Sequence, residues 1–344
     1  MSKKNKNKKK ESFKKWIGKV HLWLGLGSGL IVLLLSVTGC LFVFSQEITN
    51  LLRSDEMYVS EIKGTSIPLS ELWQKTQSAI GEKTISSATL YNNPEKSVVF
   101  TCYKGSEGSY FYFGNIEQFY SVYVNPYTGE LLGVYDEELD FFQIVKGLHW
   151  SLLLSTPIGQ FVIGWATFIF VIMLITGLIL WWPKNKAARK QRFKFQWKKS
   201  TKWRRKNYDV HNIFGFYIFS VALIIAFTGM VWAFSWFQSI VYVAGAGTTA
   251  PPNIIYEKSI VSKGNTNSAF DAAYRTAKKM HTTADAISMS KAADSTAVVN
   301  AYIQQNEGTY YIAHALQFDQ YTGRLLRERK HDEKNFGEKL ITAN

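Results

Sequence analysis

Val20-His21-Leu22-Trp23-Leu24-Gly25 and Val210-His211-Asn212-Ile213-Phe214-Gly215 are the two stretches that decide the fold, because they share one pattern. Each places a histidine at the start of an apolar segment, with a glycine four residues later. A threonine–glycine pair follows 17 residues after each histidine, as Thr38-Gly39 and as Thr228-Gly229. The two copies lie 190 residues apart, which indicates an internal duplication built around membrane helices.

Three segments contain no charged residue and are long enough to cross a bilayer. They are Leu22–Phe44 with 23 residues, Gly159–Trp182 with 24 and Ile213–Phe237 with 25. An apolar helix of about 20 residues spans a hydrocarbon core of about 30 Å. We therefore predict a membrane α-helical bundle of three transmembrane helices.

The net charge of +14 is concentrated beside these apolar segments. Residues 1–20 carry 9 lysines and residues 184–206 carry 12 lysines and arginines, whereas residues 46–148 hold 14 acidic and 7 basic residues. Basic residues that flank membrane helices stay in the cytosol and contact anionic lipid of the bilayer. The pattern predicts a multi-pass protein with a cytosolic N-terminus, and it argues against nucleic acid as a partner.

The two large polar regions repeat a second pattern. Tyr127-Thr128-Gly129 recurs 194 residues later as Tyr321-Thr322-Gly323, each time after a strand-like stretch. Glycine accepts the positive φ of a hairpin turn, so both triplets predict turns. Each region is therefore expected to be a small α+β module. The predicted helices are Pro68–Ile80 and Ser268–Met280, and the predicted strands are Ile85–Tyr91, Ser97–Tyr103, Phe119–Val124, Ala286–Ser290, Thr296–Ile303 and Ile312–Phe318.

These patterns divide the chain into seven parts. The predicted boundaries are 1–20 for a cytosolic basic tail, 21–45 for transmembrane helix 1, 46–148 for the first outer module, 149–183 for transmembrane helix 2, 184–208 for a cytosolic basic loop, 209–238 for transmembrane helix 3 and 239–344 for the second outer module.

The two cysteines do not suggest a disulfide. Cys40 lies inside the first apolar segment and Cys102 lies in the first outer region. The sequence contains no Cys-x-x-Cys-His motif, so any haem would be held by ligation alone.

The chain resembles the PepSY-associated transmembrane proteins, a bacterial group that includes inner-membrane ferric-siderophore reductases. The resemblance rests on Val20–Gly39, Gly147–Pro183, Tyr208–Gly229 and the two Tyr-Thr-Gly turns. It implies a bacterial inner-membrane location and two periplasmic PepSY-like α+β modules. Members of the group usually have a fourth span, entered through a further histidine just beyond the equivalent of Asn344. Either a truncated product or a natural three-span variant is therefore expected.

Two histidines are candidate haem ligands. A haem iron takes two neutral imidazoles from opposite faces of the porphyrin. The topology places His21 and His211 at the same cytosolic depth, and with the resemblance this predicts them as axial ligands of an inner haem b. Gly25 and Gly215, about 6 Å along the helix from these histidines, would let the porphyrin edge approach. The alternative is that both histidines are ordinary residues of the membrane boundary.

His149 is a weaker candidate, for a second haem near the outer face. Its partner would come from the fourth span, so we expect one haem in this chain and two if that helix were present. Pro157 stands between His149 and the apolar part of the second span, so a surface-lying segment is the alternative for His149. The Thr-Gly pairs are predicted to serve helix packing.

Three further histidines lie in the second outer region. His281, His314 and His331 show no metal-ligand spacing, and surface positions are expected for them.

Together these features predict an inner-membrane haem protein that passes electrons outward and reduces ferric iron, free or siderophore-bound, in the periplasm. No catalytic residue is assigned, because the sequence has no nucleophilic triad, phosphate loop or dinucleotide motif. Electrons would come from a separate donor, a soluble reductase or a quinol. The competing hypothesis is non-enzymatic: a membrane-anchored PepSY module that binds or restrains a periplasmic protein.

Overall fold

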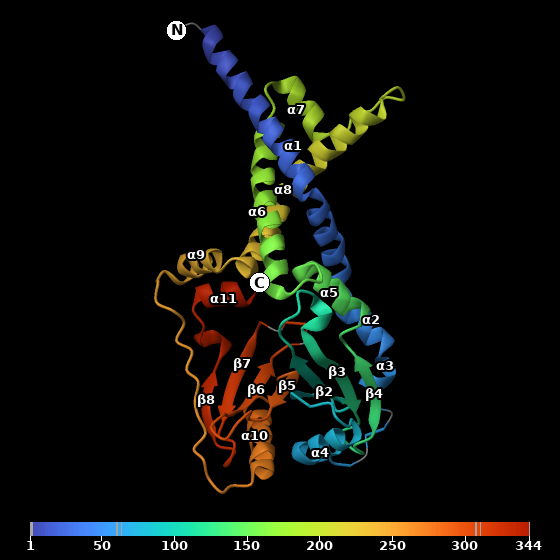
Figure 1. The fold of residues 1–344 in the computed structure, drawn as a ribbon, viewed down its shortest axis with the longest axis vertical. Coiled ribbons are helices and arrows are strands. Elements are labelled where there is room, and N and C mark those ends of the chain that lie inside the picture. Colours follow the sequence, from blue (N-terminus) through green and yellow to red (C-terminus); the bar gives the residue numbers. More distant parts are fainter. Residues whose placement is uncertain (1–2, 60, 63, 307, 310, 344) are drawn as a thin grey trace.

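The computed structural model describes residues 3–59, 61–62, 64–306, 308–309 and 311–343. A narrow stem of long helices stands on a wider domain of strands and short helices (Figure 1). The stem helices are α1 (Lys3–Phe42), α6 (Thr156–Trp181) and α8 (Trp203–Ala233).

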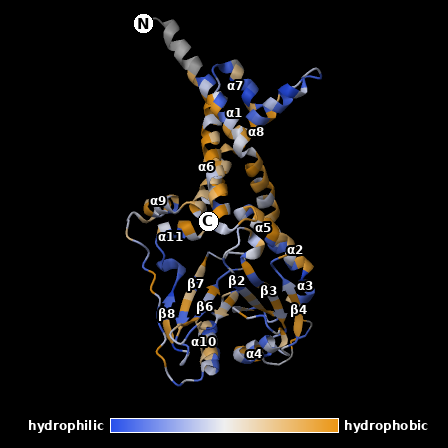
Figure 2. Cartoon of the chain, in the orientation of Figure 1, coloured by the Kyte–Doolittle hydropathy of each residue, from blue (hydrophilic) through white to orange (hydrophobic). Residues whose placement is uncertain are grey.

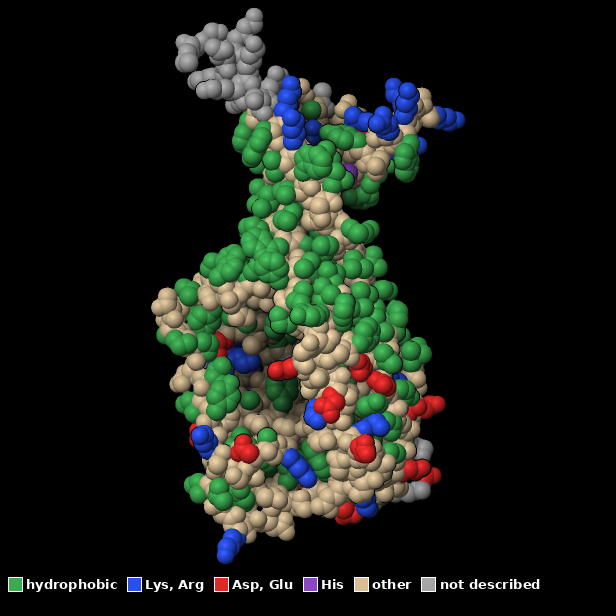
Figure 3. All heavy atoms as spheres, in the orientation of Figure 1, with side chains coloured by type: hydrophobic (Ala, Val, Ile, Leu, Met, Phe, Trp, Pro, Cys, Tyr) green, Lys and Arg blue, Asp and Glu red, His purple; other side chains and the backbone are tan. Residues whose placement is uncertain are grey.

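The stem confirms the prediction of long apolar helices. Within the described residues, three helical segments are long and apolar enough to cross a membrane: Phe13–Phe42, Thr156–Trp181 and Trp203–Ala233. Helix α6 packs against both α1 and α8. Their outer surface is apolar, as Figures 2 and 3 show, and lysine and arginine side chains gather at the end far from the sheet.

Short helices mark both ends of the stem. Most of them lie near the sheet domain, and α7 lies at the basic end (Figure 1). The bounds are α2 (Ser45–Leu52), α3 (Ser54–Met57), α5 (Phe141–Ser151), α9 (Ser235–Ala246), α11 (Phe336–Thr342) and α7 (Lys186–Phe193).

Helix α5 is separate from the second span. Leu152 and Leu153 have φ values of 55° and 57°, a left-handed conformation that ends α5 before α6 begins at Thr156. His149 therefore lies on α5, a helix separate from the apolar helix α6.

The two outer regions share one antiparallel sheet. In the described residues this sheet has eight strands in the order β4-β3-β2-β1-β5-β6-β7-β8. Strands β1 and β5 join the halves, from Ala88 opposite Met289 to Tyr91 opposite Ala286. The strands are β1 (Ser87–Tyr91), β2 (Val98–Gly105), β3 (Ile116–Val124), β4 (Leu131–Asp136), β5 (Ala286–Ser290), β6 (Val299–Gln304), β7 (Ala313–Phe318) and β8 (Leu325–Arg329), and the short 3₁₀ helices are η1 (Tyr112–Gly114) and η2 (His331–Glu333).

Two helices, α4 (Leu69–Ala79) and α10 (Thr266–Met280), pack against one face of this sheet. Trp73 of α4 meets Phe270 of α10 and Phe100 of β2 edge-on, at ring-centroid distances of 5.6 and 5.7 Å. All six predicted strands and both predicted helices are present, with small shifts at their ends.

The two predicted Tyr-Thr-Gly turns are confirmed. Gly129 and Gly323 have φ values of 77° and 69°, which only glycine adopts without strain. Asn125 and Asp319 close the two turns by accepting hydrogen bonds from the backbone N–H groups that follow them.

Candidate functional site: a histidine pair in the helical stem

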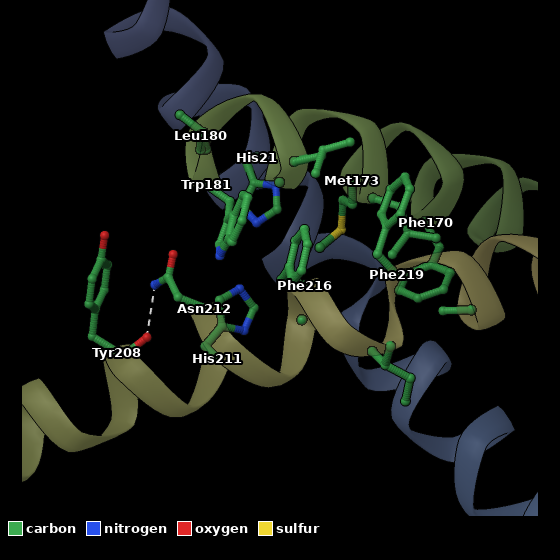
Figure 4. Close-up of a pocket in the computed structure, with 16 residues that line it drawn as sticks. His21, Phe170, Met173, Leu180, Trp181, Tyr208, His211, Asn212, Phe216 and Phe219 are labelled. Atoms are coloured by element: carbon green, nitrogen blue, oxygen red, sulfur yellow. Dashed lines mark hydrogen bonds between the residues drawn. The ribbon is translucent and has the colours of Figure 1, made fainter. Parts of the chain in front are cut away.

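A largely apolar cavity of about 420 Å³ lies between the stem helices (Figure 4). His21 of α1 and His211 of α8 both line it. Their ring centroids are 6.2 Å apart and their planes meet at 66°. The two histidines that the repeat places at the same depth therefore converge on one cavity.

Helix α6 fixes the position of His21. The Nδ1 atom of His21 lies 3.0 Å from the hydroxyl oxygen of Thr176. Gly177, the next residue, faces the same ring: a Cβ there would be 3.2 Å from Cε1 of His21. The Thr176-Gly177 pair, predicted to serve helix packing, therefore also contacts a candidate ligand.

The two candidate glycines differ in their surroundings. Gly215 lines the cavity, and a Cβ at this position would meet no atom within 4 Å. Gly25 lies against α6 instead, where a Cβ would come within 3.1 Å of the terminal methyl of Met173. Gly215 thus leaves open space beside His211, whereas Gly25 allows close contact between α1 and α6.

An aromatic wall closes one side of the cavity. Trp181 stacks on Phe216 with a centroid distance of 3.8 Å and an interplanar angle of 9°. The side chain of Trp181 is buried, and its Nε1–H has no hydrogen-bond partner among the described residues. A buried N–H without a partner carries an energetic cost, so this donor marks a place for an acceptor.

A basic side chain lies at the edge of the cavity. Arg192 donates from Nη1 to the backbone oxygen of Leu180 at 3.3 Å and to Oδ1 of Asn212 at 3.4 Å. Leu180 and Asn212 both line the cavity. Asn212 is oriented in turn by donating to the backbone oxygen of Tyr208, the dashed contact in Figure 4.

His149 lies apart from this pair. Its Nδ1 atom is 3.1 Å from the hydroxyl oxygen of Thr38 and 3.1 Å from the backbone oxygen of Leu35. Thr38 lies 17 residues along α1 from His21, a rise of about 25 Å in a helix. The structure therefore brings His21 and His211 together and leaves His149 near the other end of the stem.

The described residues contain no group of three or more His, Cys, Asp or Glu side chains that could hold a metal ion. The His21–His211 pair is a two-ligand arrangement. A porphyrin supplies four equatorial nitrogens to its iron, so a haem needs only axial ligands from the protein.

The histidines of the second module differ from the surface positions expected for them. The His281 and His314 rings stack with centroids 5.0 Å apart. Nε2 of His281 lies 3.1 Å from Oε1 of Glu328, and the side chain of His281 is only 11% exposed. The expectation was wrong for His281 because the end of α10 turns this ring against β8.

Sequence reasoning missed Thr176, Trp181 and Arg192 as residues of the site. The threonine could have been found, because its Thr-Gly pair recurs in all three spans. The other two could not, because the stacking of Trp181 on Phe216 depends on how α6 packs against α8, and the contacts of Arg192 depend on how α7 folds back against the stem.

The chain matches the family described as PepSY-associated TM region over residues 19–286. This match covers most of the chain, so the protein belongs to the PepSY-associated transmembrane family, as the sequence motifs indicated. No curated protein matches the chain. With its three apolar helices, the chain is a membrane protein with an α+β sheet domain.

Proposed function

We propose that this protein is a b-type haem protein of the bacterial inner membrane that passes electrons outward to ferric iron, free or siderophore-bound, in the periplasm. The observation that carries the proposal is the separation of 6.2 Å between the His21 and His211 rings. Two imidazoles that bind one metal from opposite sides at about 2.0–2.1 Å have ring centroids roughly 6 Å apart. The observed separation therefore supports one iron between the two rings.

The other cavity groups fit the same ligand. A porphyrin is a flat apolar ring with two carboxylates, so it needs apolar walls and a few polar donors. The wall contains the stacked Trp181 and Phe216 rings, and Gly215 leaves space beside His211. The Trp181 N–H and the nearby Arg192 guanidinium are suited to donate hydrogen bonds to the carboxylates.

The protein's own side chains would hold such a haem and keep water away from it. A bound haem would supply reversible one-electron exchange. His21 and His211 would hold it as neutral ligands, and the apolar stem would exclude water. With the basic end of the stem in the cytosol, this site would receive electrons from a soluble reductase or a quinol. His149 lies toward the sheet end of the stem, which would then face the periplasm, and an outer haem would find one ligand there.

An optical spectrum tests the proposal. Full-length protein from haem-supplied cells should show sharp α and β bands after dithionite reduction. The bands should be lost in a His21→Ala/His211→Ala double variant and kept in His331→Ala, which removes a histidine outside the stem. A featureless wild-type spectrum would reject the haem proposal and favour the non-enzymatic PepSY module that binds a periplasmic protein.

A further inference from the structure

Two of the three Thr-Gly pairs hold a histidine from another segment, in the same way. Thr176 lies 3.0 Å from Nδ1 of His21, and Thr38 lies 3.1 Å from Nδ1 of His149. In both cases the threonine is on one helix and the histidine on another. The same threonine–histidine contact therefore occurs twice, once toward each end of the stem.

The threonine hydroxyls define which histidine nitrogen carries a proton. Thr176 donates its only hydroxyl hydrogen to the backbone oxygen of Ile172 at 2.9 Å or of Met173 at 3.0 Å, within its own helix. Its oxygen then offers only lone pairs to His21, so Nδ1 of His21 must be the donor. The unprotonated nitrogen of a neutral His21 is consequently Nε2.

The same reasoning applies at the other site. Thr38 donates to the backbone oxygen of Leu34 at 2.8 Å and so accepts from His149. The backbone oxygen of Leu35, 3.1 Å from the same Nδ1, can only accept as well. Both neighbours therefore require a protonated Nδ1 on His149.

The glycine of each pair provides the space for the ring. A Cβ at Gly177 would stand 3.2 Å from Cε1 of His21, and a Cβ at Gly39 would stand 3.1 Å from Cε1 of His149. Both distances are closer than ordinary van der Waals contact, so alanine would push the ring aside. At the third pair, a Cβ at Gly229 would instead stand 3.7 Å from a methyl carbon of Thr167.

We infer that Thr176-Gly177 and Thr38-Gly39 are histidine-positioning pairs: the threonine oxygen fixes the Nδ1–H tautomer, the glycine seats the ring, and Nε2 is left free for a metal. The consequence for metal binding rests on the proposed function, whereas the tautomer does not. Acceptors for the remote N–H of a histidine ligand orient its ring and raise its basicity.

The haem-free protein tests the tautomer directly. In ¹⁵N-histidine-labelled protein in detergent at neutral pH, His21 and His149 should give the signals of neutral rings protonated at Nδ1. The signals are assigned from the His21→Ala and His149→Ala variants. Rings protonated at Nε2, or charged rings, would overturn the inference even if haem binds.

The haem-loaded protein tests the positioning role. Thr176→Val should weaken haem binding by about tenfold or more and raise the midpoint potential, because the ligand loses an acceptor for its N–H. Thr176→Ser should restore both values. The matched control is Thr228→Val, whose hydroxyl also bonds within its own helix, to Ile225 at 2.7 Å. Equal affinity and potential in the Thr176→Val and Thr228→Val proteins would contradict the role, and absence of haem from all of them would instead reject the proposed function.

Discussion

At the scale of single residues, His314 shows how burial and a neighbouring charge act together. Burial first, and then the nearby His281 ring, lower the pKa of His314 below its ordinary value of 6.5. Glu328 and Asp332 oppose this shift and Lys330 adds to it. The folded second module therefore favours the neutral form of His314, while the unfolded chain takes up a proton more readily.

This linkage predicts a loss of stability in mild acid. The unfolded state binds more protons below about pH 6.5. The free energy of unfolding should therefore be highest above that pH and should decrease as the pH falls toward the lowered pKa of the folded state. Thermal melting in detergent between about pH 7.5 and about pH 5.5 should show the decline, and His314→Gln should flatten it. An identical pH profile in that variant would rule His314 out as the cause.

Sequence reasoning located residues more easily than it located their contacts. The repeat identified His21 and His211 because they occupy equivalent positions in two spans. It did not show that the Thr176 hydroxyl lies 3.0 Å from Nδ1 of His21, since contacts between helices 155 residues apart leave no local signature. The His281–Glu328 contact was missed for the same reason.

At the scale of elements, a buried arginine at the end of α2 is paired with the segment that joins β4 to α5. Arg53 is 7% exposed and forms an ion pair with Glu137 and another, at 3.3 Å, with Asp140. Its guanidinium carbon also lies 4.2 Å from the Tyr135 ring centroid. The contacts fix how the first span enters the sheet domain.

Removing this arginine should strongly destabilise the protein. Arg53→Met leaves two carboxylates in a partly buried place without their partner, a change that costs about 3–5 kcal/mol in comparable pairs. The control is Lys104→Met, which breaks an exposed pair with Glu117 and should cost no more than about 1 kcal/mol. Equal melting temperatures for the two variants would show that the Arg53 pair does not stabilise the fold.

The elements themselves could be predicted where their pattern was strong. Long apolar runs identified the spans, and alternation identified six strands. Strands β4 and β8 were missed because their residues are mostly only partly buried and show little alternation. The break between α5 and α6 was left open as an alternative: Pro157 indicated it, whereas the two leucines with positive φ carry no sequence signal.

At the scale of the whole molecule, the two polar regions, residues 46–148 and 239–344, form one sheet domain. They share a continuous sheet through β1 and β5, and α4 is joined to α10 by Asp271, which accepts from the backbone N–H of Ser70 at 2.8 Å and from its hydroxyl at 2.6 Å. Sequence reasoning predicted two separate modules, because pairing between strands about 200 residues apart has no local signal.

The junction predicts cooperative unfolding of both halves. Asp271→Ala leaves the buried Ser70 without its acceptor and should cost about 1–3 kcal/mol. Glu71→Ala, which removes an exposed carboxylate on the same helix, is the control and should change little. Hydrogen exchange should show weaker protection in both β2 and β6 of the Asp271→Ala protein; weakening confined to one half would refute a single cooperative body.

The central claim is that His21 and His211 hold one haem between α1 and α8. Electron paramagnetic resonance of the oxidised, full-length protein, combined with a haem assay per chain, tests it most directly. If both histidines are ligands, the protein should contain about one low-spin haem per chain, and His21→Ala and His211→Ala should each give a high-spin signal or lose the haem. A low-spin signal of unchanged intensity in both single variants would contradict it.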